Sequence, residues 1–355
     1  MKKLVVIITI LMLFIPKVNA STSSASSYIL MDSTTGRVLM SKDMHTKRLI
    51  ASITKIMTAT LAIESGKLND VVEVSPIIKE AYGSGIYIEV GEEITLKDLV
   101  YGLMLRSGND AALTIAEYVG GSVDNFVLEM NKKAQSLGMK NTTFCNPHGL
   151  DEKCENISTA YDMALLTRYA NKNETYKKIV GTKRYTCKSS LKSYDWYNKN
   201  KLLSTYKYTT GGKTGFTEKA KRTLVTTASK DNVNLIVVTL NDPNDFTTHK
   251  DLYEYGFNNY EKYTIIKKQG FNLKNDYYKN VYIKNDISYL FKKDETNNLM
   301  VKYIIYKKDN VSDNDIVGKI EVFINSKMVK TEDIYVRVTK EKISLFRRIL
   351  NLFKW

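Results

Sequence analysis

Apolar segments of two kinds alternate along residues 28–257, and this alternation limits the folds that the chain can adopt. Residues 28–32 and 37–40 are apolar runs on either side of a turn that ends in Gly36, the pattern of a β-hairpin. Residues 224–228 and 234–240 are continuous apolar runs, typical of buried strands. Apolar residues recur at three- and four-residue spacing near 53–61, 96–104 and 111–119, which predicts helices. We therefore expect an α/β (α+β) domain with a helical middle.

The texture of the sequence changes from about residue 262. Short apolar segments at 281–283, 300–306, 320–324 and 334–338 alternate with polar turns, which predicts a small all-β domain. A chain of 355 residues suits about two domains. Its 43% hydrophobic and 26% charged residues are typical of globular proteins rather than disordered chains. We place the two domains at residues 21–260 and 261–340.

The N-terminus carries a targeting signal. Lys2 and Lys3 precede an apolar run at residues 4–15, and small residues at Val18 and Ala20 suit a signal peptidase. The run is shorter than the ~20 residues that span a bilayer. We therefore predict a signal peptide at residues 1–20 and an exported protein. Export argues against nucleic acid as the partner of this basic chain, whose formal net charge is +15.

The C-terminus, residues 341–355, has the pattern of a short amphipathic helix. Leucine, isoleucine and phenylalanine residues gather on one side of residues 343–355, and Arg347, Arg348 and Lys354 lie opposite. Basic amphipathic helices with aromatic residues bind at the membrane interface, and each Lys or Arg near an anionic leaflet contributes roughly 1 kcal/mol. We expect a membrane-surface anchor, with docking on the protein's own surface as the alternative.

Ser52 and Lys55 form the first of three motifs that can carry chemistry, a Ser–x–x–Lys pair in the apolar surroundings of residues 50–57. At positions i and i+3 of a helix, the two side chains lie on one face within reach. A serine hydroxyl becomes a good nucleophile when a neighbouring base removes its proton. A lysine can be that base where burial or nearby cations lower its pKa. Taken alone, the pair also fits a solvated helix surface.

Ser107 and Asn109 form the second motif, a Ser–x–Asn unit between two predicted helices. In such a connection, the hydroxyl and the amide can both point into one cleft. The hydroxyl can then relay a proton, and the amide can hold Lys55 or a substrate carbonyl. A polar turn that caps the second helix explains the same residues without any chemistry.

Lys213, Thr214 and Gly215 form the third motif, which follows two further glycines and precedes Phe216 and Thr217. Gly215 would leave room for a substrate along an edge strand. The lysine would place a positive charge near a substrate carboxylate, and the two threonines could donate hydrogen bonds to it. A glycine-rich hairpin turn is the alternative explanation.

The order and spacing of the three motifs resemble the signature of penicillin-binding proteins and serine β-lactamases. Longer stretches are similar to the low-molecular-mass penicillin-binding proteins that are serine-type D-alanyl-D-alanine carboxypeptidases, at residues 29–39, 51–58, 98–112, 146–151, 158–165 and 200–203. The similarity is dense over residues 28–257 and extends only to architecture beyond them. It implies a catalytic domain with an antiparallel sheet and a helical subdomain, followed by a small all-β domain and a terminal amphipathic helix.

The resemblance implies a reaction through an acyl-enzyme. Ser52 would attack the carbonyl between the two terminal D-alanines of a peptidoglycan stem peptide, and Lys55 would accept its proton. Ser107 and Asn109 would assist proton transfer and hold the substrate amide. Penicillins and other β-lactams would acylate the same serine. The enzyme would act at the outer face of the bacterial cytoplasmic membrane, in the cell wall.

The resemblance also assigns the groups that bind substrate. Lys213, Thr214 and Thr217 would bind the terminal carboxylate. The backbone N–H groups of Ser52 and Phe216 would form the oxyanion hole, from which removal of one donor typically costs about 10²–10³ in rate. Neither a metal nor an organic cofactor is implied.

The sequence departs from its relatives in two places near the third motif. Relatives often carry a glycine at the position of Lys221. Some also place an arginine, which helps to hold the carboxylate, on the segment that corresponds to residues 242–248, and this chain has none there. Both departures concern the carboxylate site rather than the nucleophile.

Two other functions compete with this interpretation. A serine β-lactamase would need a base for deacylation, and Glu152 followed by Asn156 matches the Glu–x–x–x–Asn pattern of one β-lactamase class. A non-catalytic β-lactam sensor or wall-binding protein would keep the serine without turnover. A Ser–His–Asp triad is disfavoured, because no Gly–x–Ser–x–Gly elbow accompanies the three histidines, His45, His148 and His249.

The three cysteines, Cys145, Cys154 and Cys187, allow at most one internal pair. Cys145 and Cys154 are close enough in sequence to bridge, but spacing alone leaves the pairing open. The spacing of paired cysteines in zinc sites is missing. We expect neither a disulfide framework nor a zinc site.

Overall fold

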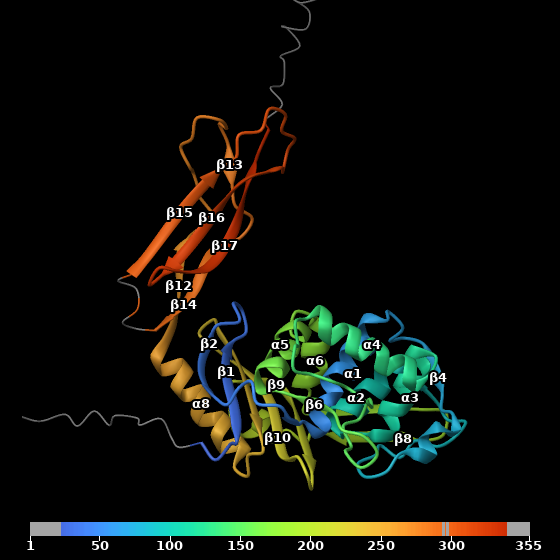
Figure 1. Cartoon of the computed structure of the whole chain (residues 1–355). Coiled ribbons are helices and arrows are strands. Elements are labelled where there is room, and N and C mark those ends of the chain that lie inside the picture. Colours follow the sequence, from blue (N-terminus) through green and yellow to red (C-terminus); the bar gives the residue numbers. More distant parts are fainter. Residues whose placement is uncertain (1–22, 293–294, 296–297, 339–355) are drawn as a thin grey trace, which may run out of the picture.

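The computed structural model describes residues 23–292, 295 and 298–338. Figure 1 shows a body of helices and strands, from which an elongated β-rich part projects beyond α8 (Asp245–Asn259). The predicted signal peptide, residues 1–20, and the predicted terminal helix, residues 341–355, lie outside the described residues. No helix among the described residues is long and apolar enough to cross a membrane.

A five-stranded antiparallel sheet forms the centre of the body, with the strand order β2-β1-β11-β10-β9. Its strands come from both ends of the body, so segments about 200 residues apart pair directly, as Leu30 does with Val237. The predicted hairpin and both predicted buried strands are confirmed. The strands are β1 (Ser27–Asp32), β2 (Val38–Lys42), β9 (Thr209–Thr217), β10 (Lys221–Lys230) and β11 (Val233–Leu240).

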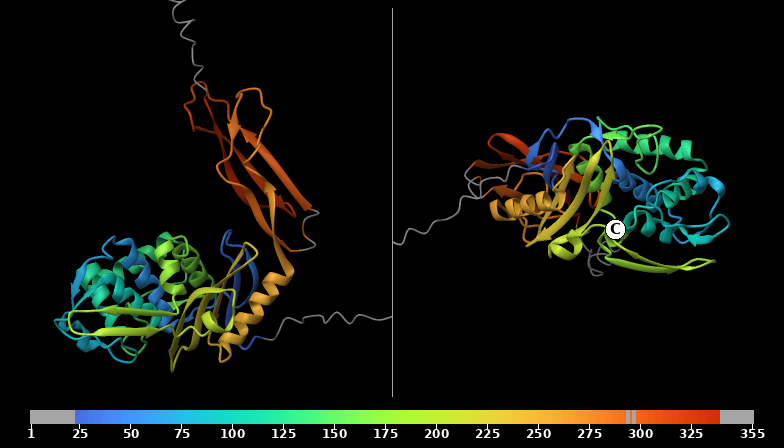
Figure 2. Two further views of the ribbon diagram at one scale, coloured as in Figure 1. Left: turned by 180° about the vertical axis from the view of Figure 1, so that it is seen from behind. Right: turned by 90° about the horizontal axis from the view of Figure 1, so that it is seen from below.

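Helices cover both faces of this sheet (Figure 2). The long α8 packs on one face, over a core cluster that includes Leu30, Leu224 and Tyr253. A helical subdomain from the middle of the sequence packs on the other face. Its helices are η1 (Ala51–Thr54), α1 (Lys55–Glu64), η2 (Pro76–Glu80), α2 (Leu96–Leu105), α3 (Asn109–Gly120), α4 (Val123–Ser136), α5 (Ala160–Ala170), α6 (Glu174–Gly181) and α7 (Leu202–Thr205).

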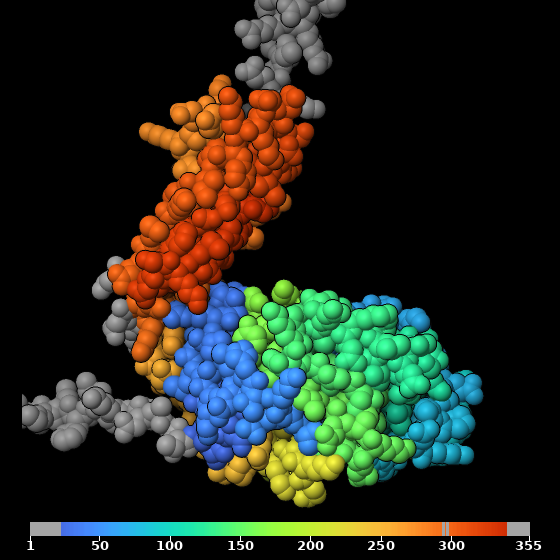
Figure 3. All heavy atoms as spheres, viewed as in Figure 1, coloured from blue at the N-terminus to red at the C-terminus, as the bar shows by residue number. Residues whose placement is uncertain are grey.

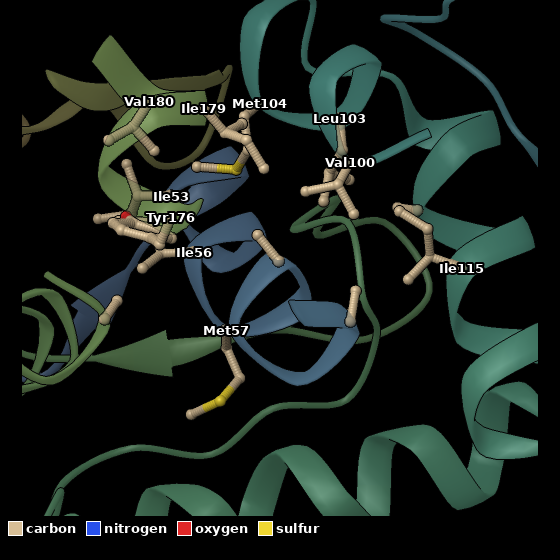
Figure 4. Packing of buried hydrophobic residues seen from close by; sticks show 14 of the residues in the cluster. Ile53, Ile56, Met57, Val100, Leu103, Met104, Ile115, Tyr176, Ile179 and Val180 are labelled. Carbon is tan, nitrogen blue, oxygen red and sulfur yellow. The ribbon is translucent and has the colours of Figure 1, made fainter. Parts of the chain in front are cut away.

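The segment that carries Ser52 and Lys55 runs through the core of this subdomain. Ile53, Ile56 and Met57 are fully buried, among apolar side chains of α2, α3 and α6 (Figure 4). The apolar periodicity near residues 53–61 therefore marks a central helix rather than a surface one. A fully buried apolar side chain of this size contributes roughly 1.5–3 kcal/mol, so the position of η1 and α1 is strongly fixed.

Short two-stranded sheets connect the helices of the subdomain. One of them, the β7–β8 hairpin, places Trp196 and Tyr194 against α2 and its surroundings. The short strands are β3 (Arg48–Leu49) with β6 (Ile157–Ser158), β4 (Val71–Glu73) with β5 (Glu93–Thr95), and β7 (Arg184–Lys188) with β8 (Ser193–Tyr197).

The part after α8 is built of strands alone, as predicted. It has a two-stranded sheet, β12-β14, and a four-stranded sheet, β13-β17-β16-β15, around a separate core that includes Ile287, Val317 and Ile334. The domain boundaries at residues 260 and 340 stay predictions. The strands are β12 (Tyr260–Ile266), β13 (Val281–Tyr282), β14 (Ile287–Lys292), β15 (Leu299–Ile305), β16 (Ile316–Ile324) and β17 (Lys327–Val336).

The two parts meet near the turn between β1 and β2. The guanidinium of Arg37 donates to the Leu290 carbonyl at 2.6 Å and pairs with Glu295 at 2.7 Å. It also lies over the rings of Tyr260 and Tyr289. In the space-filling view, the β-rich part contacts the body at this end and extends away from it (Figure 3).

Candidate active site

The three predicted motifs come from three separate elements and meet where the edge strand β9 lies against the helical subdomain. Ser52 is in η1, Ser107 is in the connection between α2 and α3, and Thr214 and Gly215 are in β9. All four line one cavity of about 640 Å³, together with Phe216. An amide and a lysine that the sequence also singled out, Asn109 and Lys213, are buried directly beneath it.

Lys55 lies at the centre of the polar contacts. Its Nζ donates to Ser52 Oγ at 3.0 Å, to Asn109 Oδ1 at 2.7 Å and to the His148 carbonyl at 2.6 Å. The predicted i, i+3 contact is therefore made, by a residue of η1 and the first residue of α1. The Lys55 side chain is fully buried, which excludes the solvated-surface alternative for this pair.

Burial holds the pKa of Lys55 well below its ordinary value, and the nearby charges of Lys213 and Lys199 lower it further. Both effects disfavour the ammonium form. A lysine with a strongly lowered pKa next to a serine hydroxyl can accept that hydroxyl's proton near neutral pH. The geometry and the electrostatics therefore suit Lys55 as a general base for Ser52.

Lys213 and Ser107 form a second polar pair on the other side of the cavity. Lys213 Nζ donates to Ser107 Oγ at 3.0 Å and to the Thr214 carbonyl at 2.6 Å. Burial lowers the pKa of Lys213 to about 7, with a smaller contribution from the charge of Lys199. Ser107 has a φ of 66°, in the left-handed region that non-glycine residues rarely adopt. Backbone strain of this kind gathers at functional sites, and here it places the hydroxyl toward Lys213.

Glycines let two backbones approach the nucleophile closely. A Cβ at Gly215 would lie 2.4 Å from Thr223 Oγ1 and 2.9 Å from the Ser52 backbone nitrogen. A Cβ at Gly149 would lie only 2.0 Å from the Ala51 carbonyl oxygen. The sequence interpretation gave Gly215 the role of leaving room for substrate. The structure adds a different reason for this glycine, because the protein's own backbone and Thr223 occupy the space beside it.

The remaining groups of the third motif have different surroundings. Thr214 and Phe216 line the cavity. The Thr217 hydroxyl instead donates to Asp151 Oδ2 at 2.5 Å and accepts from the Ala220 N–H. Thr217 therefore contacts a loop of the helical subdomain, and its predicted contact with a substrate carboxylate stays a prediction. The same holds for the oxyanion role of the Ser52 and Phe216 N–H groups, although both residues line one cavity.

Arg222 is a candidate binding residue that sequence reasoning missed. It lies opposite Phe216 across the β9–β10 pair, so its side chain shares a face of the sheet with that of Thr214. It lines the cavity and pairs with the buried Asp245 at 2.7 Å. The sequence did show this arginine, in the segment already recognised as divergent. Only the register of the two strands shows that it faces the cavity.

The departure at Lys221 has a conformational explanation. Its φ is 58°, in the left-handed region, which a glycine adopts without steric cost. The glycine that relatives often carry there thus fits the backbone of this turn, and the present chain keeps the conformation with a lysine. The departure concerns the backbone of the turn rather than any group that lines the cavity.

The histidines take structural positions. His249 is fully buried between the sheet and α8, where its ring contacts the Thr226 and Thr239 hydroxyls, and burial lowers its pKa to about 3. The ring of His148 accepts from the Leu150 N–H, and only its backbone carbonyl contacts Lys55. His45 packs against Tyr161. Among the described residues, no cluster of three or more His, Cys, Asp or Glu side chains could hold a metal ion.

The expectation about the cysteines is wrong in one respect. Cys145 and Cys154 form a disulfide with a Cα–Cα distance of 6.2 Å, and Cys187 is free. The bridge closes the loop between α4 and β6, which contains His148 and Asp151. Spacing allowed this pair, but only the tertiary structure brings its two ends together.

Comparison with known proteins places both parts of the chain. Residues 16–244 match the family described as D-alanyl-D-alanine carboxypeptidase, and residues 257–342 match the C-terminal domain of penicillin-binding protein 5. The D-alanyl-D-alanine carboxypeptidase DacF of Bacillus subtilis is 37% identical over 253 residues. That match covers 69% of this chain and 65% of the relative, so it spans just under two thirds of the relative's length.

Solved structures agree. Penicillin-binding protein 5 of Haemophilus influenzae superposes with a TM-score of 0.74 at 26% identity, covering 89% of this chain and 97% of the other. The DD-transpeptidase of Streptomyces K15 superposes on 67% of this chain and 99% of its own, with a TM-score of 0.64 and 32% identity. These matches confirm the predicted fold class. The chain belongs to the D-alanyl-D-alanine carboxypeptidase family of penicillin-binding proteins.

Proposed function

We propose that this protein is a serine-type D-alanyl-D-alanine carboxypeptidase that removes the terminal D-alanine from peptidoglycan stem peptides. The observation that carries the proposal is the buried Lys55 ammonium group 3.0 Å from Ser52 Oγ, in one cavity with Ser107 and Thr214. A lowered lysine pKa is what a base at this position needs. The names of the relatives support the same reaction and substrate.

Acylation would begin with Lys55, in its neutral form, taking the Ser52 proton as Oγ attacks the penultimate D-alanine carbonyl. The N–H groups of Ser52 and Phe216 would stabilise the oxyanion. The C–N bond then breaks, and the leaving amine takes a proton through the Ser107 hydroxyl, which Lys213 contacts at 3.0 Å. In the second half, water attacks the acyl-enzyme, its proton passes to Lys55, and Ser52 is released.

The terminal carboxylate of the substrate would bind at the β9 end of the cavity. Lys213 and Thr214 provide a cation and a hydroxyl there, as the sequence predicts, and Arg222 lies on the same face of the sheet. Arg222 could provide the guanidinium that some relatives place on the segment corresponding to residues 242–248. Its pairing with Asp245 leaves part of the guanidinium exposed, with 41% of the side-chain surface accessible.

The β-lactamase alternative has less support. Its proposed base, Glu152, is exposed to solvent and is not among the residues that line the cavity. The Asn156 amide, which would share its water, donates to Thr54 Oγ1 and to the Asn146 carbonyl inside the protein. The family of the chain also favours a carboxypeptidase over a lactamase or a silent sensor.

The test is the intact mass of the protein with time after mixing with excess penicillin and destruction of the free drug. We expect a stable adduct, release of D-alanine from a D-Ala-D-Ala peptide, and loss of both in Ser52→Ala. An adduct that disappears within seconds would identify a β-lactamase. An adduct without D-alanine release would identify a sensor, and an adduct on the Ser52→Ala variant would exclude Ser52 as the nucleophile.

We further propose that the protein is exported and held at the membrane surface by residues 341–355. The signal-peptide pattern and the basic amphipathic pattern of these residues support this placement, as does the cell-wall role of the family. Deletion of residues 343–355 should release the protein from anionic vesicles while a soluble peptide is still cleaved. Retention of the truncated protein on the vesicles would show that another surface binds the membrane.

A further inference from the structure

A disulfide-closed loop lies directly against the proposed catalytic groups. Cys145 and Cys154 close the loop between α4 and β6, with nine residues of sequence separation. No regular helix or strand forms between the two cysteines. The shape of the loop therefore depends on the covalent bridge and on side-chain hydrogen bonds rather than on a backbone ladder.

The loop contacts the nucleophile segment at three points. The His148 carbonyl accepts from Lys55 Nζ at 2.6 Å. The Pro147 carbonyl accepts from Thr58 Oγ1 at 2.6 Å, one turn further along α1. Gly149 lies so close to the Ala51 and Ser52 backbone that it has no room for a side chain. A displacement of this loop would therefore change the surroundings of both Ser52 and Lys55.

Hydrogen bonds inside the loop converge on two asparagines next to the bridge. Asn146 Oδ1 accepts from the Gly149 N–H at 2.6 Å, and its amide donates to the Leu150 carbonyl at 2.8 Å. Asn156 Oδ1 accepts from the Cys145 N–H at 2.7 Å. Both asparagines are buried and adjoin a cysteine or lie two residues from one. The bridge thus fixes the ends of the network that orients the His148 carbonyl.

The loop also reaches the third motif. Asp151 accepts from the Thr217 hydroxyl at 2.5 Å, and its backbone carbonyl accepts from Lys219 Nζ at 3.0 Å. The loop therefore connects the Lys55 side of the cavity with the end of strand β9. Both cysteines are only half-buried, so a small reductant can reach the bridge without unfolding the core.

We propose that the Cys145–Cys154 disulfide is a positioning element of the active site, which makes acylation of Ser52 depend on the redox state of the protein. In the oxidised form, the bridge holds the His148 carbonyl on Lys55 and keeps water away from it. A dithiol reductant would transfer two electrons and two protons to the bridge, giving two cysteine thiols and an oxidised dithiol. The loop is then held by hydrogen bonds alone. This proposal rests on the proposed acyl-enzyme function.

The pH dependence of acylation separates an effect through Lys55 from general loosening. Besides Ser52, the groups around its ammonium are Asn109 and Asp110 on α3, Lys213 on β9, Lys199 before α7, and His148 and Lys153 on the loop. Burial is the largest cause of the lowered Lys55 pKa. Water admitted by a loosened loop would raise that pKa. Since the base must be neutral, acylation would then require a higher pH.

The experiment uses the mature full chain and penicillin, with the acylation rate constant measured by intact mass across a range of pH. Four samples are compared: oxidised protein, protein reduced with dithiothreitol, the Cys145→Ser, Cys154→Ser double variant, and Cys187→Ser as the matched control. We expect the reduced protein and the double variant to lose about tenfold or more in rate near neutral pH, since a misplacement of 1 Å can cost about 10²-fold. The acidic limb of their profiles should move to higher pH. Oxidised Cys187→Ser should match the wild type.

Several outcomes would overturn the proposal. Complete reduction, verified by mass, with no change in rate or pH profile would do so. A loss of rate with an unchanged profile would show that the bridge acts on the fold rather than through Lys55. If the double variant does not fold, reduction and reoxidation of the wild type give the same comparison, with circular dichroism confirming that the reduced protein is folded. If the oxidised wild type forms no adduct, the proposed function itself fails.

Discussion

At the scale of single residues, the site depends on two lysines that are buried without a carboxylate contacting either ammonium group. Lys55 and Lys213 are fully buried, and their ammonium groups contact hydroxyl, amide and carbonyl oxygens. A carboxylate partner would stabilise the charged forms and raise both pKa values. Its absence among these contacts leaves burial as the dominant influence, and burial lowers both pKa values. Local chemistry thus prepares one lysine to accept a proton.

The two lysines predict a bell-shaped pH dependence. The second-order acylation rate should rise as Lys55 becomes neutral with increasing pH, and should fall as Lys213 loses its charge near its pKa of about 7. In Lys213→Arg, the cation persists because guanidinium does not deprotonate in this range. The alkaline fall should therefore disappear in the variant, whatever its absolute rate. An alkaline limb that is the same in both proteins would show that another group controls it.

At the scale of elements, the site depends on how closely strand β9 approaches η1. Gly215 lies opposite Thr223 in the register, and Thr223 Oγ1 donates to the Ile50 carbonyl at 3.0 Å. The strand, its neighbour β10 and the nucleophile segment are thus joined at one point. The position of Ser52 relative to Thr214 follows from this contact rather than from any flexible side chain.

Gly215→Ala should therefore reduce acylation strongly, by about 10²-fold or more, because its Cβ would force β9 away from the Ser52 backbone. Gly211→Ala is the matched control in the same strand, since its Cβ would meet the Val180 side chain at 2.5 Å on α6. We expect both variants to lose stability, measured by thermal unfolding, and only Gly215→Ala to lose acylation. Equal acylation in the two variants would refute the close-approach argument.

At the scale of the whole molecule, the β-rich part is joined to the body by few specific contacts. Arg37 makes an ion pair with Glu295 and a hydrogen bond to Leu290, and it lies between two tyrosine rings. Its contacts lie on the far side of the sheet from the β9 edge, since they begin at the β1–β2 turn. The junction can therefore change without changing the active site.

Arg37→Ala should lower the free energy of unfolding of the β-rich part by about 1.5–3 kcal/mol, the usual value of hydrogen bonds to charged groups. Calorimetry should show its transition moving to a lower temperature, apart from that of the body. The penicillin acylation rate should stay the same. Arg48→Ala, which removes an arginine bound to Ser27 within the body, is the control. An unchanged β-rich transition in Arg37→Ala would show that the clamp contributes nothing to stability.

The sequence by itself determined the fold class, because apolar periodicity records which face of each helix or strand is buried. It also determined which serine, lysine and asparagine residues carry chemistry, since their order and spacing form a rare pattern. Gly215 was singled out as well, but for a different reason from the one that the structure gives. Secondary structure at Ser107 and Asn109 was placed to within a residue, because a polar break between two apolar periods is a local signal.

Only the tertiary structure decided what depends on contacts between distant segments. The burial of Lys55 comes from η1, α3 and the disulfide loop together, so no local pattern could show its lowered pKa. The face of Arg222 follows from a strand register, and the pairing of Cys145 with Cys154 follows from the path of a loop. Thr217 contacts Asp151 because that loop reaches β9. Local sequence specifies which side chains are present, but long-range packing specifies which of them meet.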